Sequence, residues 1–280
     1  MKLHKQVWAF SLLLLFLLLF GCSKRKGDFG TAPNPADTSS TAFVPPVTTI
    51  LEGPANNEVL HVPTVTFKWS GTKDVVRFEL SVNNSSWLST NNTSYTYDYL
   101  DEGQYVVIIR AIHQNGTTEK NPPLRTFIVD AVTADNSIIF YPRKNLTTTL
   151  NVSSSYQIRC ENFKNVAGVQ LTLQYNSQLV AITDVSNLNG SIFNKSGMSG
   201  QVLLTNSGTD TTIMNIVGLP TRKDVPFGVS GSDLLVTLSI KPKQKGQIPI
   251  TIVTAQTLLR DSTNTNLSKG SFVNGLIVVQ

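Results

Sequence analysis

The sequence predicts an all-β fold built from two consecutive β-sandwich domains. From Thr48 onward, short runs alternate between apolar and polar residues, and Asn, Gly, Ser and Pro separate these runs. Such alternation is typical of strands with one buried face, and several antiparallel strands of this kind bury those faces by closing two sheets face to face. Removing the first 22 residues from 280 leaves 258, which is enough for one large or two ordinary domains.

Residues 1–22 have the pattern of a signal peptide. Lys2 and Lys5 give a basic start, and the uncharged run Gln6–Gly21 is shorter than the roughly 20 apolar residues that a transmembrane helix needs. The run ends in Leu-Phe-Gly-Cys, which resembles the lipobox of bacterial lipoproteins. The resemblance implies that the residues before Cys22 are removed and that the Cys22 thiol is acylated, which anchors the chain by lipid in the bacterial cell envelope. The alternative is an uncleaved anchor.

Residues 23–47 are predicted to form a disordered tether. The segment is rich in Ser, Thr, Pro, Gly and Ala, and it has too few apolar residues to bury the surface that ordering requires. At its start, Ser23 stands where an Asp is associated with inner-membrane retention, which favours the outer membrane or the cell surface. The three cations that follow suit the anionic headgroups of a membrane.

The positive charge is confined to the N-terminal segment. Of 23 basic residues, five lie within residues 1–26, and 23 minus 5 leaves 18 basic residues against 18 acidic ones. The rest of the chain is therefore neutral and has no basic field for the phosphates of a nucleic acid.

Residues 48–130 are predicted to form the first sandwich. The runs Val-Thr-Phe-Lys-Trp at 65–69 and Phe-Glu-Leu-Ser-Val at 78–82 place alternate apolar residues on one face. The segment Tyr-Leu-Asp-Glu-Gly-Gln-Tyr at 99–105 resembles the tyrosine corner of fibronectin type III domains, with Tyr105 at the corner, and Trp69 resembles their early core tryptophan. This immunoglobulin-like fold serves as a spacer or as a binding domain, so the resemblance implies no particular activity.

Residues 131–280 contain a longer series of strands whose order resembles a cohesin domain, the jelly-roll β-sandwich of cellulosome-type scaffolds. Two segments carry the resemblance, an aromatic-ending strand with its return at 163–185 and a later hairpin at 229–252. The connection between the two predicted domains is short, so we expect the domains to touch or to sit in a fixed relation.

The resemblance to cohesins implies a protein partner, the dockerin, which is a small calcium-loaded helical module that binds one sheet face. With Val169, Leu171, Leu173 and Tyr175 pointing inward, the outward residues of the matching strand are Gly168, Gln170, Thr172 and Gln174. Cohesins place Asn and Asp near the start of this strand, and the loss of the carboxylate removes a charge-assisted acceptor. The outward face either binds a different partner or is a solvated sheet surface.

The residues offer little for catalysis, so we predict no enzyme activity, no cofactor and no metal site. His61 and His113 have no Cys or His at metal-ligand spacing, and the acidic residues of the second domain are scattered. The acidic residues Asp98, Asp101 and Glu102 lie at a predicted turn, where we expect water to solvate the charges. Cys160 alternates with apolar residues, which predicts a buried, inert thiol.

Carbohydrate binding is the alternative to protein docking, because sandwich modules bind sugars through exposed aromatic rings. Trp87 lies in a polar stretch that would expose it, although core packing is the other reading of the same residue. The sequence thus predicts a membrane-anchored, non-enzymatic binding or scaffold protein of the envelope. Three classes remain open: a module that docks a protein such as a dockerin-bearing polysaccharide-degrading enzyme, a module that binds polysaccharide at the cell surface, and a structural spacer.

Overall fold

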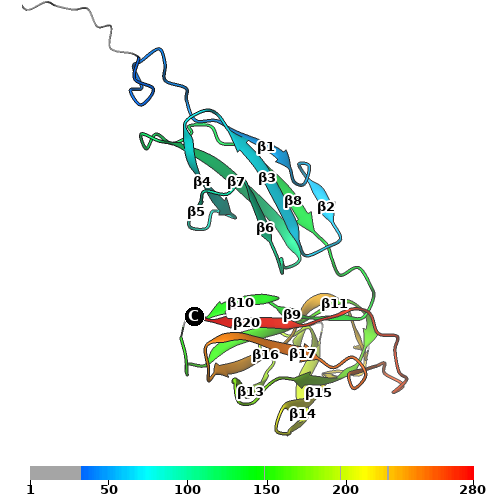
Figure 1. The fold of residues 1–280 in the computed structure, drawn as a ribbon. Helices are drawn as coiled ribbons and strands as arrows, with labels where there is room; N and C mark the ends of the chain where they lie inside the picture. The colour runs from blue at the N-terminus through cyan, green and yellow to red at the C-terminus, as the bar shows by residue number, and fades with distance from the viewer. Residues whose placement is uncertain (1–32, 148, 196, 226) are drawn as a thin grey trace, which may run out of the picture. The chain divides into compact units, whose positions relative to one another are not determined.

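The computed structural model describes residues 33–147, 149–195, 197–225 and 227–280. The predicted signal peptide with Cys22, and the first part of the predicted tether, lie outside the described residues. Residues 34–42 form consecutive turns, in which Ser40 N donates to Asp37 O at 2.9 Å. The compact unit that follows spans Pro46–Gln280. It is all-β, as predicted (Figure 1).

The first part of this unit consists of two sheets packed face to face. The smaller sheet has the order β1-β3-β6, with β1 at Thr48–Glu52, β3 at Val65–Gly71 and β6 at Ser94–Tyr97. The larger sheet has the order β2-β8-β7-β4-β5, with β2 at Glu58–Leu60, β8 at Leu124–Val129, β7 at Gly103–His113, β4 at Val75–Val82 and β5 at Leu88–Thr90. Except for the parallel pair β2 and β8, the strands of both sheets pair antiparallel.

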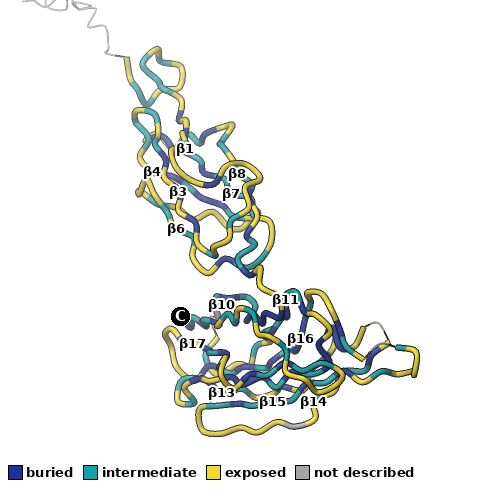
Figure 2. The backbone as a smooth tube through the Cα atoms, turned by 90° about the vertical axis from the view of Figure 1, so that its right-hand side faces the viewer, coloured by how far each residue is buried: buried dark blue, intermediate teal, exposed yellow. Residues whose placement is uncertain are grey.

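The core of the first sandwich follows the predicted alternation. Val65, Phe67 and Trp69 on β3 are all buried, and Figure 2 shows the buried residues following β3 and β7. The Trp69 ring packs edge-on against Phe78, with 5.7 Å between ring centroids. The hydroxyl of Tyr105 donates to the Asp101 carbonyl oxygen at 3.1 Å, which is the backbone contact expected of a tyrosine corner.

The second part consists of two larger sheets. One has the order β10-β20-β17-β12-β15-β14, with β18 pairing β12 at its side; the bounds are β10 Lys144–Thr147, β20 Gly275–Val279, β17 Gly246–Ile252, β12 Gly168–Gln174, β15 Thr211–Pro220, β14 Met198–Ser207 and β18 Leu258–Arg260. The other has the order β13-β16-β11-β9-β19, with bounds β13 Val180–Asn187, β16 Val229–Pro242, β11 Ser154–Val166, β9 Ser137–Tyr141 and β19 Phe272–Val273.

Side chains from both sheets fill a separate core in the second sandwich. The inward residues predicted for β12, from Val169 to Tyr175, are buried, and Phe140, Phe163 and Phe193 pack into the same core. The part of the chain that the structure describes has one helical turn, the 3-10 turn η1 (Ile192–Asn194), and no α-helix. Within the same ranges no helix is long and apolar enough to cross a membrane.

Cys160 is buried in this core, as predicted. Burial raises the pKa of its thiol to about 12, and Sγ donates to the Asp233 carbonyl oxygen at 3.3 Å. Since the thiolate is the reactive form, we expect a Cys22→Ser variant to show no reaction with a thiol reagent near pH 8 until denaturant is added. Titration with a chromogenic disulfide checks this, and rapid labelling of the native protein would contradict it.

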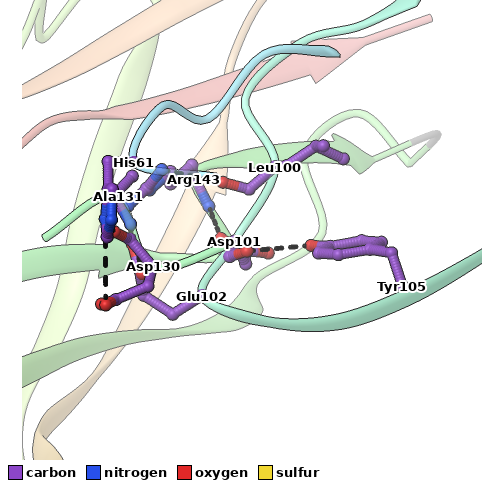
Figure 3. A network of polar contacts seen from close by, with 8 residues as sticks. All are labelled: His61, Leu100, Asp101, Glu102, Tyr105, Asp130, Ala131 and Arg143. Atoms are coloured by element: carbon purple, nitrogen blue, oxygen red, sulfur yellow. Dashed lines mark hydrogen bonds and ion pairs between the residues drawn. The ribbon is translucent and has the colours of Figure 1, made fainter. Parts of the chain in front are cut away.

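A buried arginine joins the two sandwiches (Figure 3). Arg143, in the turn between β9 and β10, is 1% exposed. Its backbone N–H donates to Asp101 Oδ1 at 2.7 Å, its Nη1 donates to the Leu100 carbonyl oxygen at 2.8 Å, and its Nη2 forms an ion pair with Glu102. The other oxygen of Glu102 accepts the Ala131 N–H at 2.8 Å. The expectation that the domains touch is thus confirmed.

The expectation that water solvates the acidic turn is wrong for two of its three residues. Asp98 is exposed and pairs with Lys144 Nζ at 3.0 Å, whereas Asp101 and Glu102 are half-buried beneath Arg143. Burial raises the pKa of both carboxyl groups. The backbone hydrogen bond and the charge of Arg143 oppose this rise at Asp101, and the charge of Arg143 and the Ala131 hydrogen bond oppose it at Glu102. The turn residues therefore form an intramolecular contact between the two sandwiches. A local sequence pattern does not reveal such a contact.

Candidate functional site

The outward face of β12 lies near the middle of the seven-stranded sheet. β12 pairs with β15 along its whole length, from Gly168 opposite Val217 to Gln174 opposite Thr211. On its other side it pairs with β18 at one end and with β17 at the other. The chain between β17 and β18 therefore has to cross beside the middle of β12.

The four predicted partner-binding residues do not form one continuous exposed row. Gly168 and Gln170 are half-buried at the end of β12 that pairs with β18, and Gln174 is exposed at the other end. Thr172, between them, is fully buried. The prediction that Thr172 offers a surface to a partner is therefore wrong.

The segment between β17 and β18 covers Thr172. The Thr172 hydroxyl donates to the Gln256 carbonyl oxygen at 3.3 Å, and the Thr172 N–H donates to Thr257 Oγ1 at 3.2 Å. The side-chain amide of Gln170 donates to the same Gln256 oxygen at 3.0 Å. Alternation along the strand predicted which way Thr172 points, but not that a distant segment lies over it.

The neighbouring strands extend the surface around Gly168 and Gln170. From Thr211 to Gly218, β15 alternates between half-buried outward residues and buried residues, and β14 adds exposed residues at the sheet edge. Leu203 is 60% exposed, and Phe227, just after a gap in the described residues, is 36% exposed. We call the following outward residues the neutral face: Gly168, Gln170, Gln174, Gln201, Leu203, Ile213, Asn215, Val217 and Leu219.

The neutral face has no ionisable side chain, and neither do the strands that carry it. The sequences of β12, β14, β15, β17 and β20 contain no Asp, Glu, Lys, Arg or His. The opposite sheet differs, because β11, β13 and β16 carry Arg159, Glu161, Lys164, Asp184, Asp233 and Lys241. Exposed apolar side chains without charge are the composition found at the centre of protein–protein interfaces.

Charged residues border the neutral face at the turn after β18. Arg260 Nη1 donates to the Asn264 carbonyl oxygen at 2.8 Å, and Asp261 Oδ1 accepts the N–H groups of Thr263 and Thr265, both at 2.9 Å. The bond from the Thr265 backbone, followed by that from the Thr263 side chain, lowers the pKa of Asp261 below its ordinary value. Both charged groups are thus engaged in holding the turn.

Trp87, the predicted carbohydrate-binding residue, lies just before β5 and is 40% exposed. The guanidinium carbon of Arg110 lies 3.8 Å from the centroid of its ring. Glu79 holds that guanidinium by two bonds of 2.8 and 2.6 Å. One face of the indole is therefore covered, which leaves at most the other face for a sugar ring, and carbohydrate binding stays a prediction.

The described residues offer no group of three or more His, Cys, Asp or Glu side chains that could hold a metal ion. His61 is exposed, and its Nδ1 lies 2.8 Å from the Asp130 carbonyl oxygen. His113 is buried at the end of β7, where Nδ1 accepts the Asn115 N–H at 3.3 Å. His61 follows β2 and His113 ends β7, and the structure does not bring the two histidines into one site.

Sequence reasoning did not single out Asn215, Val217 or the turn after β18. These residues reach Gly168 and Gln170 only through strand pairing between segments that are far apart in the chain. The one signal available in the sequence was the absence of charge across several consecutive outward positions of β14 and β15.

No protein-family model matches the chain, and no curated protein matches it either. The solved structures to which the chain is similar include cohesin domains. A non-cellulosomal cohesin from the hyperthermophilic archaeon Archaeoglobus fulgidus is 15% identical over 52% of this chain and 92% of its own, with a TM-score of 0.40. A type II cohesin domain from the cellulosome of Acetivibrio cellulolyticus is 14% identical over 51% and 95%, with a TM-score of 0.41. A type I cohesin–dockerin complex from Clostridium thermocellum gives 12% identity over 52% and 100%, with a TM-score of 0.40.

Proposed function

We propose that the second sandwich is a non-catalytic module that docks a protein partner through the neutral face. The observation that carries the proposal is the sheet that has no ionisable residue on five strands yet exposes Leu203 and Leu219 to solvent. A sheet surface that only needs to be soluble usually carries charged residues, as the opposite sheet does. An uncharged apolar face is instead suited to being covered.

The partner class follows from the sequence resemblance to cohesins, which supports a dockerin-like helical module, one borne for example by a polysaccharide-degrading enzyme. Gly168 and Gln170 replace the Asn and Asp of that family near the start of this strand. Without a carboxylate the face cannot select a partner by charge, so recognition depends on shape and apolar contact. In the same proposal, acylated Cys22 anchors the chain at the outer membrane, and the first sandwich is a spacer similar to fibronectin type III domains.

The test is binding of the full chain to a panel of purified, calcium-loaded dockerin modules by biolayer interferometry, with and without chelator. For a module that binds, we expect Leu203→Asp and Leu219→Asp each to weaken the affinity by about tenfold or more, because each buries a charge in the interface. Both residues are surface-exposed, so the stability of the fold should change by less than about 0.5 kcal/mol.

The matched control is Val152→Asp, which puts the same charge on an exposed valine outside the neutral face. It should bind as the unmodified chain does. Docking through the neutral face would be contradicted if all three variants bound as tightly as the unmodified chain, or if all three lost the same amount of affinity.

A further inference from the structure

A hollow of about 280 Å³ lies in the neutral face, where β12, β15 and the turn after β18 meet. Gly168 and Gln170 line it from β12, and Asn215 and Val217 line it from β15. Phe227 and Leu258 contribute further apolar surface. Asn264 and the charged pair Arg260 and Asp261 line the side formed by β18 and its turn, so the hollow combines apolar side chains with amides and with one cation and one anion.

The hollow exists because of two features of the backbone. Gly168 has no side chain, and a Cβ atom there would lie 3.3 Å from Val217 Cγ1, so any larger residue would project into this space. β12 also exchanges its partner from β17 to β18, which brings the turn after β18 against the face. Arg260 and Asp261 hold that turn through hydrogen bonds to its backbone. The walls are therefore formed before anything binds.

The lining selects an uncharged occupant. Arg260 and Asp261, the two charged residues of the lining, have opposite signs and hold the turn through hydrogen bonds, so the lining carries no net charge. The two central strands of the hollow, β12 and β15, carry no counter-ion for a buried ion. A bulky apolar side chain would instead contact Val217, Phe227 and Leu258, while the amides of Gln170 and Asn215 suit the peptide groups beside it.

We propose that this hollow receives one aliphatic or aromatic anchor residue of the protein partner, flanked by uncharged residues. The inference rests on the proposed docking function and adds to it the chemistry of the partner's contact. The neutral face provides the surrounding apolar surface, and the hollow provides a position at which a side chain of the partner is enclosed. Such central, enclosed side chains contribute most of the affinity in protein interfaces.

The probe that tests the hollow is N-acetyl-leucinamide, added to the full chain with labelled methyl groups and followed by NMR. We expect saturable shifts of the Val217 and Leu258 methyl signals, and no such shifts with N-acetyl-aspartate amide. Methyl glucoside forms the third arm. Equal or larger shifts with the charged amide or with the sugar would overturn the inference, and so would the absence of saturable shifts with the leucine probe.

Two variants locate the binding. Phe227→Ala removes one apolar side chain of the hollow. Because Phe227 is partly exposed, the variant should fold, and its affinity for the leucine probe should fall by about tenfold. Gln174→Ala, on the exposed end of the same strand β12, is the matched control and should leave the probe unaffected. A methyl spectrum that keeps its dispersion shows that each variant is folded. Equal affinities of the two variants would overturn the assignment to the hollow.

The two proposals fail in distinguishable ways. In one outcome, Leu203→Asp and Leu219→Asp weaken binding to a dockerin module, while Phe227→Ala binds the module and the probe with unchanged affinity. Docking through the neutral face then stands, and the proposed anchor position is wrong. If the probe saturates the hollow but no face variant affects any module, docking through the neutral face is wrong, and so is the assignment of the hollow to a protein partner.

Discussion

The Arg143→Met substitution is expected to lower the free energy of unfolding by about 3 to 5 kcal/mol, the usual cost of removing one partner from a buried ion pair. Methionine keeps the apolar stem but removes the guanidinium. Glu102 then loses its counter-ion, and the Leu100 carbonyl oxygen loses its donor. Urea unfolding followed by far-UV circular dichroism and by the fluorescence of Trp69, a core residue of the first sandwich, measures the effect.

The matched control for this prediction is Lys68→Met, which removes the partner of Glu52 from an exposed ion pair of 2.8 Å. Because both of its members are solvated, that pair should contribute less than about 1 kcal/mol. A Glu102→Gln, Arg143→Met double variant should lose less than the sum of the two single losses, because both changes break the same pair. Similar losses for Arg143→Met and Lys68→Met would contradict the assigned role of Arg143.

The loss caused by Arg143→Met should depend on pH. Burial raises the pKa of Asp101 and Glu102 in the folded protein, so the contribution of these groups to stability is present below their ordinary values of 3.8 and 4.5 and is lost as the pH rises through the folded values. The charge of Arg143 limits this loss, and without it both pKa values rise further. The difference in unfolding free energy between the variant and the unmodified chain should therefore be largest near neutral pH and smaller at about pH 4. A difference that is constant with pH would contradict this linkage.

The fold could be predicted because its cause is local. A strand with one buried face repeats every two residues, so the run that contains Val65, Phe67 and Trp69 shows its buried face in the sequence alone. The same holds for the inward residues of β12. Cys160 was correctly predicted as buried because it shares that period.

The candidate site could be predicted only in part, because its form depends on contacts between distant segments. The period of β12 gives the direction of Thr172, but the segment that covers Thr172 belongs to the connection between β17 and β18. A charged turn is predicted to be solvated unless its partner is known, and Arg143 lies in the other sandwich from Asp101 and Glu102. The hollow beside Gly168 likewise arises from β15 and the turn after β18.

The second large effect is expected at Glu119, whose buried carboxylate fastens β1 to β7. One of its oxygens accepts the Thr48 N–H at 2.9 Å, and the other accepts the Thr48 hydroxyl at 2.6 Å and the Ala111 N–H at 3.0 Å. Glu119→Ala removes three bonds to one group and leaves two N–H donors buried without an acceptor. Hydrogen bonds to a charged group contribute about 1.5 to 3 kcal/mol each and are not additive, so we expect a loss of about 3 kcal/mol in urea unfolding.

Two further variants test whether the effect of Glu119 comes from its buried carboxylate or only from the shape of its side chain. Glu119→Gln keeps one oxygen acceptor but turns an amide donor toward the Ala111 N–H or toward Thr48, so it should lose less than alanine does but still about 1 to 2 kcal/mol. Glu58→Ala removes a carboxylate that accepts the Ala55 N–H at 2.7 Å in an exposed position, and it should cost less than about 1 kcal/mol because water replaces the bond. If glutamine restored full stability, shape alone would explain the position. If Glu58→Ala cost as much as Glu119→Ala, burial would not be the reason for the effect, since the two carboxylates differ chiefly in their exposure to solvent.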